Sequence, residues 1–198
     1  MIKLVIFDAY GVTLTGGFPP TMKTLAKRFN KDWEYLQNIF YTKYFNQAAE
    51  RKITQQKAWE LAIKETSIPI TIEEIKDVHY SFMHINKDII QFINKVKKDK
   101  KTAILLTKNT REQHNDVNKK LNFTKYFDEV INTWELNLPK ASKETIEYVL
   151  KKFNVKPNET IYIDDQKINL IEAKKLGVYT IFYENLDQFK KDFDKLYK

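Results

Sequence analysis

The sequence predicts an α/β fold in which a doubly wound parallel sheet carries a small helical cap inserted after its first strand. Two observations predict it. Short apolar runs of strand length alternate with amphipathic helical segments through most of the chain, and such alternation favours parallel strands with helices on both faces of the sheet. One long stretch, residues 18–85, contains helical patterns only, which indicates an insertion.

Five apolar runs have the length and composition of buried strands. The first, residues 3–7, ends abruptly at a turn signal in residues 8–11. The others are residues 102–107, 160–165 and 179–183, with a weaker run at 127–131. The helical segments around them are residues 87–98, 111–121, 142–153 and 169–176, the last of which is stopped by Gly177.

The insert is expected to hold four helices, at residues 22–29, 33–45, 55–63 and 72–82. Thr71 and Glu74 have the spacing of a capping box at the start of the last helix. Most of the aromatic residues between 33 and 45 are expected to form a small core of the insert itself. The chain is therefore expected to divide into an α/β core of residues 1–17 and 86–198 and a helical cap of residues 18–85. The cap would cover the carboxyl ends of the strands as a lid.

Composition excludes several classes of protein. The 198 residues are 42% hydrophobic, which is enough for one sizeable core. There is no cysteine, so a disulfide framework, a thiolate metal site and a cysteine nucleophile are all ruled out. The apolar run before Asp8 is too short for a signal-peptide core or a membrane span. We therefore expect a cytoplasmic protein without a membrane partner.

The net charge of +8 raises the question of a nucleic-acid partner. Most of the basic residues are lysines spread over helix-like segments of the second half of the chain. Only three of the 34 basic residues are arginines, although guanidinium groups are the usual readers of phosphates and bases. The pattern favours solvated helix faces over a nucleic-acid-binding patch.

Polar residues follow three of the predicted strands where each strand ends. Asp8 follows the first, Thr107 ends the second, and Asp164 and Asp165 end the third. Because ligands of doubly wound sheets bind beyond the carboxyl ends of the strands, these side chains are expected to share one crevice. Asp8 alone would be an ordinary turn residue, since aspartate is common in turns. Gly11 allows a tight loop after Asp8 whose backbone amides can face an anion.

The adjacent carboxylates of Asp164 and Asp165 repel each other unless a positive charge compensates them. Mg²⁺ prefers hard oxygen ligands, only a few of which come from the protein. Asp8 together with one or both residues of the pair would satisfy this preference. Lys140, which lies just before the helix predicted from residue 142, could neutralise the remaining charge. The sequence therefore predicts a magnesium site.

Four short motifs in this order resemble those of the haloacid dehalogenase superfamily. They are Asp8-Ala9-Tyr10-Gly11-Val12-Thr13-Leu14, Leu105-Leu106-Thr107-Lys108-Asn109, Pro139-Lys140, and Ile163-Asp164-Asp165 with Asn169. Residues 50–59 also resemble the cap segment of the phosphatase branch that has an early helical cap. The motifs span nearly the whole chain, and the resemblance implies a Rossmann-like core.

The resemblance also implies a mechanism, in which Asp8 attacks a small phosphorylated metabolite and forms an aspartyl-phosphate. Thr107 and Lys140 would hold the phosphoryl oxygens. Mg²⁺ would be bound by Asp8, the Tyr10 carbonyl, Asp164 and Asp165. The remaining residues of the motifs that would lie on the substrate side are Gly11, Lys108 and Asn109.

Tyr10 departs from the phosphatase pattern, which has a second aspartate at this position as the general acid and base. A phenol with a pKa of about 10 can donate a proton at neutral pH but is a poor base for activating water. Tyrosine here is typical of the 2-haloacid dehalogenase branch, which needs no metal, and that activity with Asp8 as nucleophile is one alternative. No arginine-rich segment resembling the halide clamp of that branch follows the first strand. A binding or regulatory protein without turnover is the other alternative, and the substrate and the oligomeric state are left open.

Overall fold

The computed structural model describes residues 1–197. The chain forms two compact units. The first, here called the α/β unit, consists of residues 1–14, 85–108 and the chain from residue 122 onward. The second, here called the helical unit, consists of residues 15–84 and 109–121.

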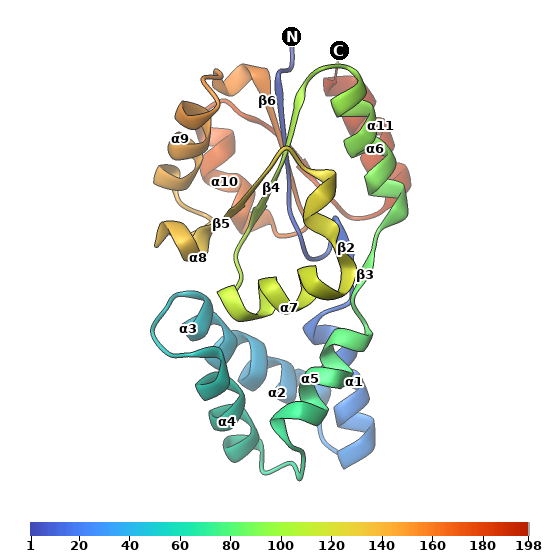
Figure 1. Ribbon diagram of the computed structural model, residues 1–198, viewed down its shortest axis with the longest axis vertical. Helices are drawn as coiled ribbons and strands as arrows, with labels where there is room; N and C mark the ends of the chain where they lie inside the picture. Colours follow the sequence, from blue (N-terminus) through green and yellow to red (C-terminus); the bar gives the residue numbers. More distant parts are fainter. Residues whose placement is uncertain (198) are drawn as a thin grey trace. The chain divides into compact units, whose positions relative to one another are not determined.

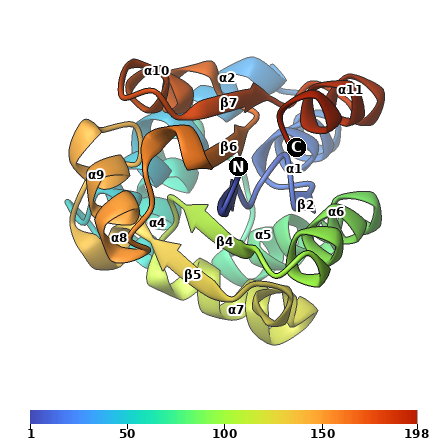
Figure 2. The ribbon, with the colours of Figure 1, turned by 90° about the horizontal axis from the view of Figure 1, so that it is seen from above.

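The α/β unit contains a five-stranded sheet in which every neighbouring pair of strands is parallel. The central strand β1 (Leu4–Phe7) lies between β4 (Thr102–Thr107) and β6 (Thr160–Asp164), and the edges are β5 (Glu129–Asn132) and β7 (Tyr179–Phe182). This order of strands can be followed in Figure 2. The predicted fold class is confirmed.

Helices cover both faces of this sheet. Figures 1 and 2 show α9 (Lys143–Lys152) and α10 (Lys167–Lys175) on one face, with α6 (Lys87–Lys98) and α11 (Leu186–Leu196) on the other. The short helical segments of the unit are η2 (Phe123–Tyr126), α8 (Thr133–Leu136) and η3 (Pro157–Glu159). All four residues of β1 are buried, as expected when successive side chains point to opposite, covered faces.

Two lysine-rich segments of the α/β unit lie where helices end. Lys97 and Lys98 are in the last turn of α6, and Lys151 and Lys152 are in the last turn of α9. Positive charge is favourable there because the helix dipole is negative at its carboxyl end.

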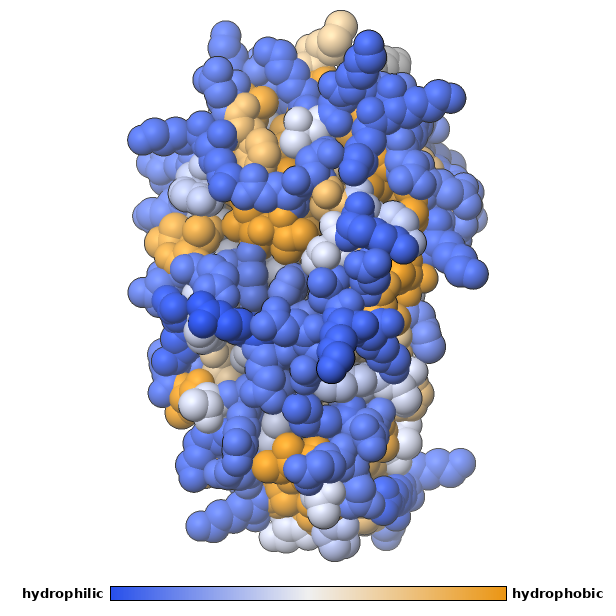
Figure 3. Space-filling view, viewed as in Figure 1, coloured by the Kyte–Doolittle hydropathy of each residue, from blue (hydrophilic) through white to orange (hydrophobic). Residues whose placement is uncertain are grey.

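Hydrophilic side chains cover most of the face seen in Figure 3, and apolar ones form separate patches. No helix within residues 1–197 combines the length and apolar composition needed to cross a membrane.

The helical elements of residues 15–84 are α1 (Phe18–Phe29), α2 (Trp33–Gln37), the π-helical segment η1 (Asn38–Phe45), α3 (Asn46–Ala49), α4 (Gln55–Thr66) and α5 (Ile72–Ser81). The helical unit thus contains the four helices predicted for the insert, of which the one at residues 33–45 is divided into α2 and η1, and it also contains α3, which was not predicted. The capping box of Thr71 and Glu74 is present. Phe18, Phe40, Phe45 and Trp59 are buried in the unit's own apolar core. The chain passes from one unit to the other within two strands of two residues each, β2 (Leu14–Thr15) and β3 (His84–Ile85), which form a separate small sheet.

Helix α7 (Arg111–Leu121) belongs to the helical unit, whereas the alternation of elements in the sequence placed it in the core. Lys76 Nζ of α5 lies 3.0 Å from Glu112 Oε1 and 3.3 Å from Asp116 Oδ2. The hydroxyl of Tyr80 donates to Asp116 Oδ2 at 3.0 Å. That residues 1–17 and 86–198 form one domain and residues 18–85 another, the cap, stays a prediction.

Candidate active site

Three carboxylates meet at the carboxyl edge of the sheet in the α/β unit. Asp8 follows β1, and Asp164 and Asp165 come from the end of β6, which pairs in parallel with β1 so that Phe7 lies opposite Ile163. The backbone N–H of Asp8 donates to the carbonyl oxygen of Ile163 at 2.9 Å. Carboxylate oxygens of the three aspartates lie within 4.8 Å of one another. Residues far apart in the sequence are thus brought to one place.

Lys140 lies among these carboxylates. Its side chain is buried, and Nζ contacts Asp8 Oδ1 and lies 2.7 Å from Asp164 Oδ2. The loop that carries Lys140 is tied to the start of α9, because Thr145 Oγ1 donates to the Pro139 carbonyl oxygen at 2.8 Å. Ser142, the N-cap of this helix, also donates to that oxygen through its backbone N–H, at 3.1 Å. Lys140 therefore reaches the site from a fixed backbone position.

The two members of the acidic pair have different surroundings. Both oxygens of Asp164 accept hydrogen bonds from the Asn169 side-chain amide, at 3.0 and 3.1 Å, and Oδ1 also accepts from the Gln166 backbone at 2.8 Å. By contrast, Asp165 Oδ1 is buried without a hydrogen-bond partner among residues 1–197. Burying a polar oxygen without a hydrogen-bond partner costs free energy. Asp165 Oδ1 is therefore the oxygen of the pair that is available to bind a ligand.

Position 11 requires a glycine because the loop after β1 lies close to the side chain of Asp165. Its φ is +92°, and a Cβ at this position would collide with the carboxylate of Asp165. The backbone N–H of Gly11 donates to the Leu14 carbonyl oxygen at 2.8 Å. The amide is therefore used within the loop, and the glycine contributes by letting the loop approach Asp165.

The remaining predicted residues fall into two groups. Thr107 ends β4, and its buried Oγ1 has no hydrogen-bond partner within the described chain. Lys108 is half-buried and also belongs to the α/β unit, as does the half-buried Tyr10, which forms a β-bridge with Leu14. Asn109 belongs to the helical unit and is fully buried there. The structure thus brings Asp8, Gly11, Lys140 and the acidic pair together within one unit.

Burial dominates the electrostatics of the site. Burial, together with the charges of Asp164 and Asp165, raises the pKa of Asp8 to about 8, against the opposing effect of Lys140. Burial and the charge of Asp164 raise the pKa of Asp165 to about 6. For Lys140, burial alone would lower the pKa, but Asp8 and Asp164 hold it well above its ordinary value. Three carboxylates therefore share one ammonium group, which leaves negative charge in excess.

This donor set fits a divalent cation. It offers hard carboxylate oxygens, one of them buried and unsatisfied, as Mg²⁺ requires. Burial is the first cause of the raised pKa values of Asp8 and Asp165, and the charges of the neighbouring carboxylates add to it. A bound cation would compensate the negative charge and favour the ionised carboxylates.

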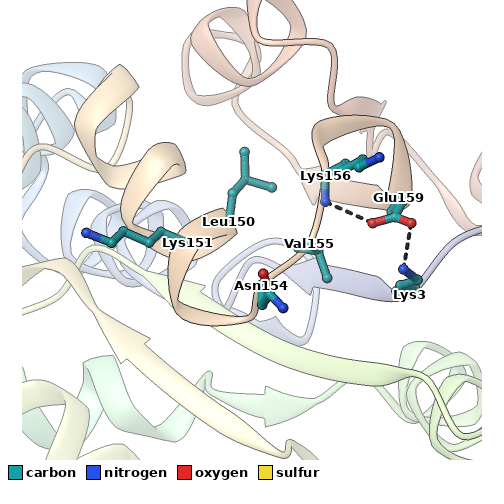
Figure 4. Close-up of a pocket in the computed structure, with 7 residues that line it drawn as sticks. All are labelled: Lys3, Leu150, Lys151, Asn154, Val155, Lys156 and Glu159. Carbon is teal, nitrogen blue, oxygen red and sulfur yellow. Dashed lines mark hydrogen bonds and ion pairs between the residues drawn. The ribbon is translucent and has the colours of Figure 1, made fainter.

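One pocket lies away from this chemistry. The pocket in Figure 4, with a volume of about 420 Å³, is lined by Lys3, the end of α9, residues 154–156 and Glu159. Lys3 Nζ lies 2.7 Å from Glu159 Oε1. Because Lys3 precedes β1 and Glu159 precedes β6, this pocket is at the amino ends of the strands. The carboxylate site is at their opposite ends.

One contact of the site was not predicted from the sequence. The hydroxyl of Tyr162 donates to Asp164 Oδ2 at 2.8 Å. Residues two apart in a strand point to the same face, so the proximity of Tyr162 to Asp164 could have been read from the pattern. It was missed because Tyr162 sits in an apolar run and looks like an ordinary core residue.

The site and the parallel sheet that carries it can be compared with known families, and the comparison gives a class of hydrolases. The sequence model of the family described as haloacid dehalogenase-like hydrolase matches residues 16–183, and the chain belongs to this family. The resemblance drawn from the motifs is thereby confirmed.

Curated relatives and solved structures are also similar to this chain, and three of them are described here. The rat protein named bifunctional epoxide hydrolase 2 is 24% identical to this chain over 98% of its length. This chain spans only 39% of the length of that relative. The D-ribitol-5-phosphate phosphatase of Bacteroides thetaiotaomicron is 23% identical, with 93% of each protein covered. A HAD family enzyme of the same bacterium, solved in complex with magnesium and inorganic phosphate, has a TM-score of 0.75 and 21% identity, covering 93% of this chain and 95% of the other. This last likeness establishes the fold.

Proposed function

We propose that this chain is a Mg²⁺-dependent phosphatase of a small phosphorylated metabolite, with Asp8 as its nucleophile. The observation that carries the proposal is the meeting of Asp8, Asp164 and Asp165 around Lys140 at the carboxyl edge of the sheet. The similarity to D-ribitol-5-phosphate phosphatase supports the choice of substrate class. The complex of a related fold with magnesium and inorganic phosphate supports the cofactor.

In the proposed reaction, a carboxylate oxygen of Asp8 attacks the phosphorus atom and the bond from phosphorus to the ester oxygen breaks. Lys140 and the Thr107 hydroxyl, which has no protein partner among the described residues, would bind the phosphoryl oxygens. Water then cleaves the aspartyl-phosphate and releases inorganic phosphate. Lys108 is proposed to help bind the substrate, in keeping with the motif it belongs to. For Gly11 and Asn109, binding of the substrate stays a prediction from their motifs.

The proposed ligands of Mg²⁺ are Asp8, the Tyr10 carbonyl oxygen and the acidic pair. Within that pair we assign the direct role to Asp165, because its Oδ1 lacks a partner among residues 1–197 while Asp164 is already hydrogen-bonded at both oxygens. When bound, Mg²⁺ supplies positive charge that stabilises the phosphoryl oxygens in the transition state. It also favours the ionised form of Asp8, which the attack needs.

The direct test is hydrolysis by the purified protein of a panel of phosphomonoesters that includes pentitol phosphates. We expect release of phosphate that requires Mg²⁺ and stops when EDTA is added. Activity equal in EDTA and in Mg²⁺, or no hydrolysis of any member of the panel, would count against the proposal.

Mg²⁺ binding is expected to tighten as the pH rises from about 6 to about 8. Over this range the metal-free protein loses protons from Asp165 and then from Asp8, whose pKa values are raised to about 6 and about 8. Because a cation binds only the deprotonated carboxylates, its binding must release protons. Calorimetric titrations at pH 6 and pH 8, in buffers of different ionisation enthalpy, measure both effects. An affinity that is the same at both pH values would contradict the prediction.

Tyr10→Asp is expected to raise turnover by about 10²-fold, which lies within the usual range for general acid–base catalysis. The phenol of Tyr10 can protonate the leaving group, but it is a poor base for the water that cleaves the aspartyl-phosphate. We therefore expect this second step to be slow in the natural protein. Steady-state rates with an aryl phosphate measure the gain, and Tyr10→Phe is the matched control, which should give none.

The same variant addresses the alternative of a binding or regulatory protein. If Tyr10→Asp binds Mg²⁺ and still hydrolyses nothing, the lack of turnover has another origin and the binding role is favoured.

Tyr10 itself favours a second candidate, a metal-free 2-haloacid dehalogenase in which Asp8 displaces halide from carbon. Release of chloride from 2-chloropropionate in EDTA would support that activity.

A further inference from the structure

Tyr162 has the largest side chain among the fully buried residues of the described chain. It lies in β6 within the apolar cluster that also contains Leu4, Ile6 and Leu170. A phenylalanine would supply the same apolar ring. The additional hydroxyl is costly in such surroundings unless it forms a hydrogen bond. The partner that it has is a charged group of the proposed active site, Asp164.

The contact continues through Asp164 to the nucleophile. Asp164 Oδ2 accepts from the Tyr162 hydroxyl at 2.8 Å and lies 2.7 Å from Lys140 Nζ. The same Nζ contacts Asp8 Oδ1. Tyr162, Asp164, Lys140 and Asp8 thus form a continuous buried chain of polar contacts.

Lys140 is shared between two carboxylates, so what surrounds one of them affects the other. Each hydrogen-bond donor to Asp164 takes up part of its negative charge and weakens its attraction for Lys140. Without the Tyr162 hydroxyl, Asp164 would hold Lys140 more strongly. Lys140 would then interact less with Asp8 and with a phosphoryl group bound beside it.

We infer that Tyr162 is a positioning residue whose hydroxyl, acting through Asp164, sets how Lys140 is shared between Asp164 and Asp8. The effect on turnover rests on the proposed phosphatase function. The effect on the position of Lys140 does not depend on that function.

The test variant is Tyr162→Phe, which removes one oxygen and keeps the ring. Tyr197→Phe is the matched control, because it removes a hydroxyl that donates to Asp99 Oδ2 at 3.1 Å within the same unit. We expect kcat for 4-nitrophenyl phosphate in Mg²⁺ to fall about tenfold in Tyr162→Phe with KM within twofold, because a hydrogen bond to a charged group is lost. Tyr197→Phe should keep the natural kcat.

A crystal structure of Tyr162→Phe separates positioning from general stability. We expect Lys140 Nζ to stay with Asp164 and to move away from Asp8 Oδ1. A variant that keeps both Lys140 contacts and a kcat within twofold of the natural protein would overturn the inference. Should the natural protein hydrolyse no phosphomonoester, the proposed function fails, and the position of Lys140 in the variant still decides the inference.

A second variant covers the case in which Tyr162→Phe does not fold. Asn169→Ser withdraws a different donor from Asp164, since the Asn169 amide donates to both of its carboxylate oxygens. The same shift of Lys140 toward Asp164 is expected. An unchanged Lys140 in this variant would also overturn the inference.

Discussion

Asp8→Asn is expected to lower phosphatase turnover by a factor on the order of 10⁴ or more, while the metal-free protein becomes no less stable. An amide cannot form the acyl-phosphate bond, so covalent catalysis is lost. The fold does not need the charge, because burial raises the pKa of Asp8 to about 8.

The sign of the stability effect follows from linkage. The pKa of Asp8 is higher in the folded chain, at about 8, than in the unfolded chain, where it is about 3.9. The folded state therefore binds the extra proton, and its contribution to stability is lost as the pH rises from about 4 to about 8. The Asp8→Asn variant does not lose stability in this way as the pH rises. At pH 8 its free energy of unfolding should therefore be higher than that of the natural protein.

Urea unfolding in EDTA at pH 6 and pH 8, together with turnover in Mg²⁺, measures both effects. Asp88→Asn is the control, because Asp88 is exposed at the start of α6. Turnover by Asp8→Asn within tenfold of the natural protein would exclude Asp8 as the nucleophile.

Lys140→Met is expected to lower the free energy of unfolding by about 3–5 kcal/mol in EDTA, the usual cost of breaking a buried ion pair on one side. Methionine fills a similar space without charge and leaves Asp8 and Asp164 without their shared ammonium group. Turnover should fall as well, on the order of 10³-fold, because a charge next to the phosphoryl group is lost.

Mg²⁺ should restore part of the stability of Lys140→Met, because the cation compensates the same carboxylates. The control is Lys175→Met, which breaks an exposed pair at 2.7 Å with Glu172 and should cost at most about 1 kcal/mol. Urea unfolding with and without Mg²⁺ is the measurement. A loss below about 1 kcal/mol in Lys140→Met would show that Lys140 is not the counterion of the site.

Much of the fold follows from local patterns. The run at residues 102–107 coincides with β4 (Thr102–Thr107), and the weaker run at 127–131 lies one to two residues before β5 (Glu129–Asn132). Strands β2 and β3 were not predicted, because two residues carry no periodicity. The allocation of α7 to the helical unit could not be read from its own sequence either, since an amphipathic helix does not specify which partner it packs against.

The candidate site was predictable to the extent that topology determines it. Asp8 and the acidic pair meet because parallel strands place their carboxyl ends at one edge of the sheet. Lys140 was selected from many lysines only by its position and by a family resemblance, because its contact depends on a loop whose path has no local signal. Tyr162 was overlooked because a buried tyrosine has the same apolar pattern whether or not its hydroxyl reaches a charged group.

The fit of Gly11 against Asp165 has a consequence for redesign of the ion preference. Lengthening Asp165 to glutamate would press the added methylene toward the loop that Gly11 keeps close. Positions 11 and 165 are therefore expected to change together in evolution, and an engineer would have to rebuild the loop after β1 before altering the acid.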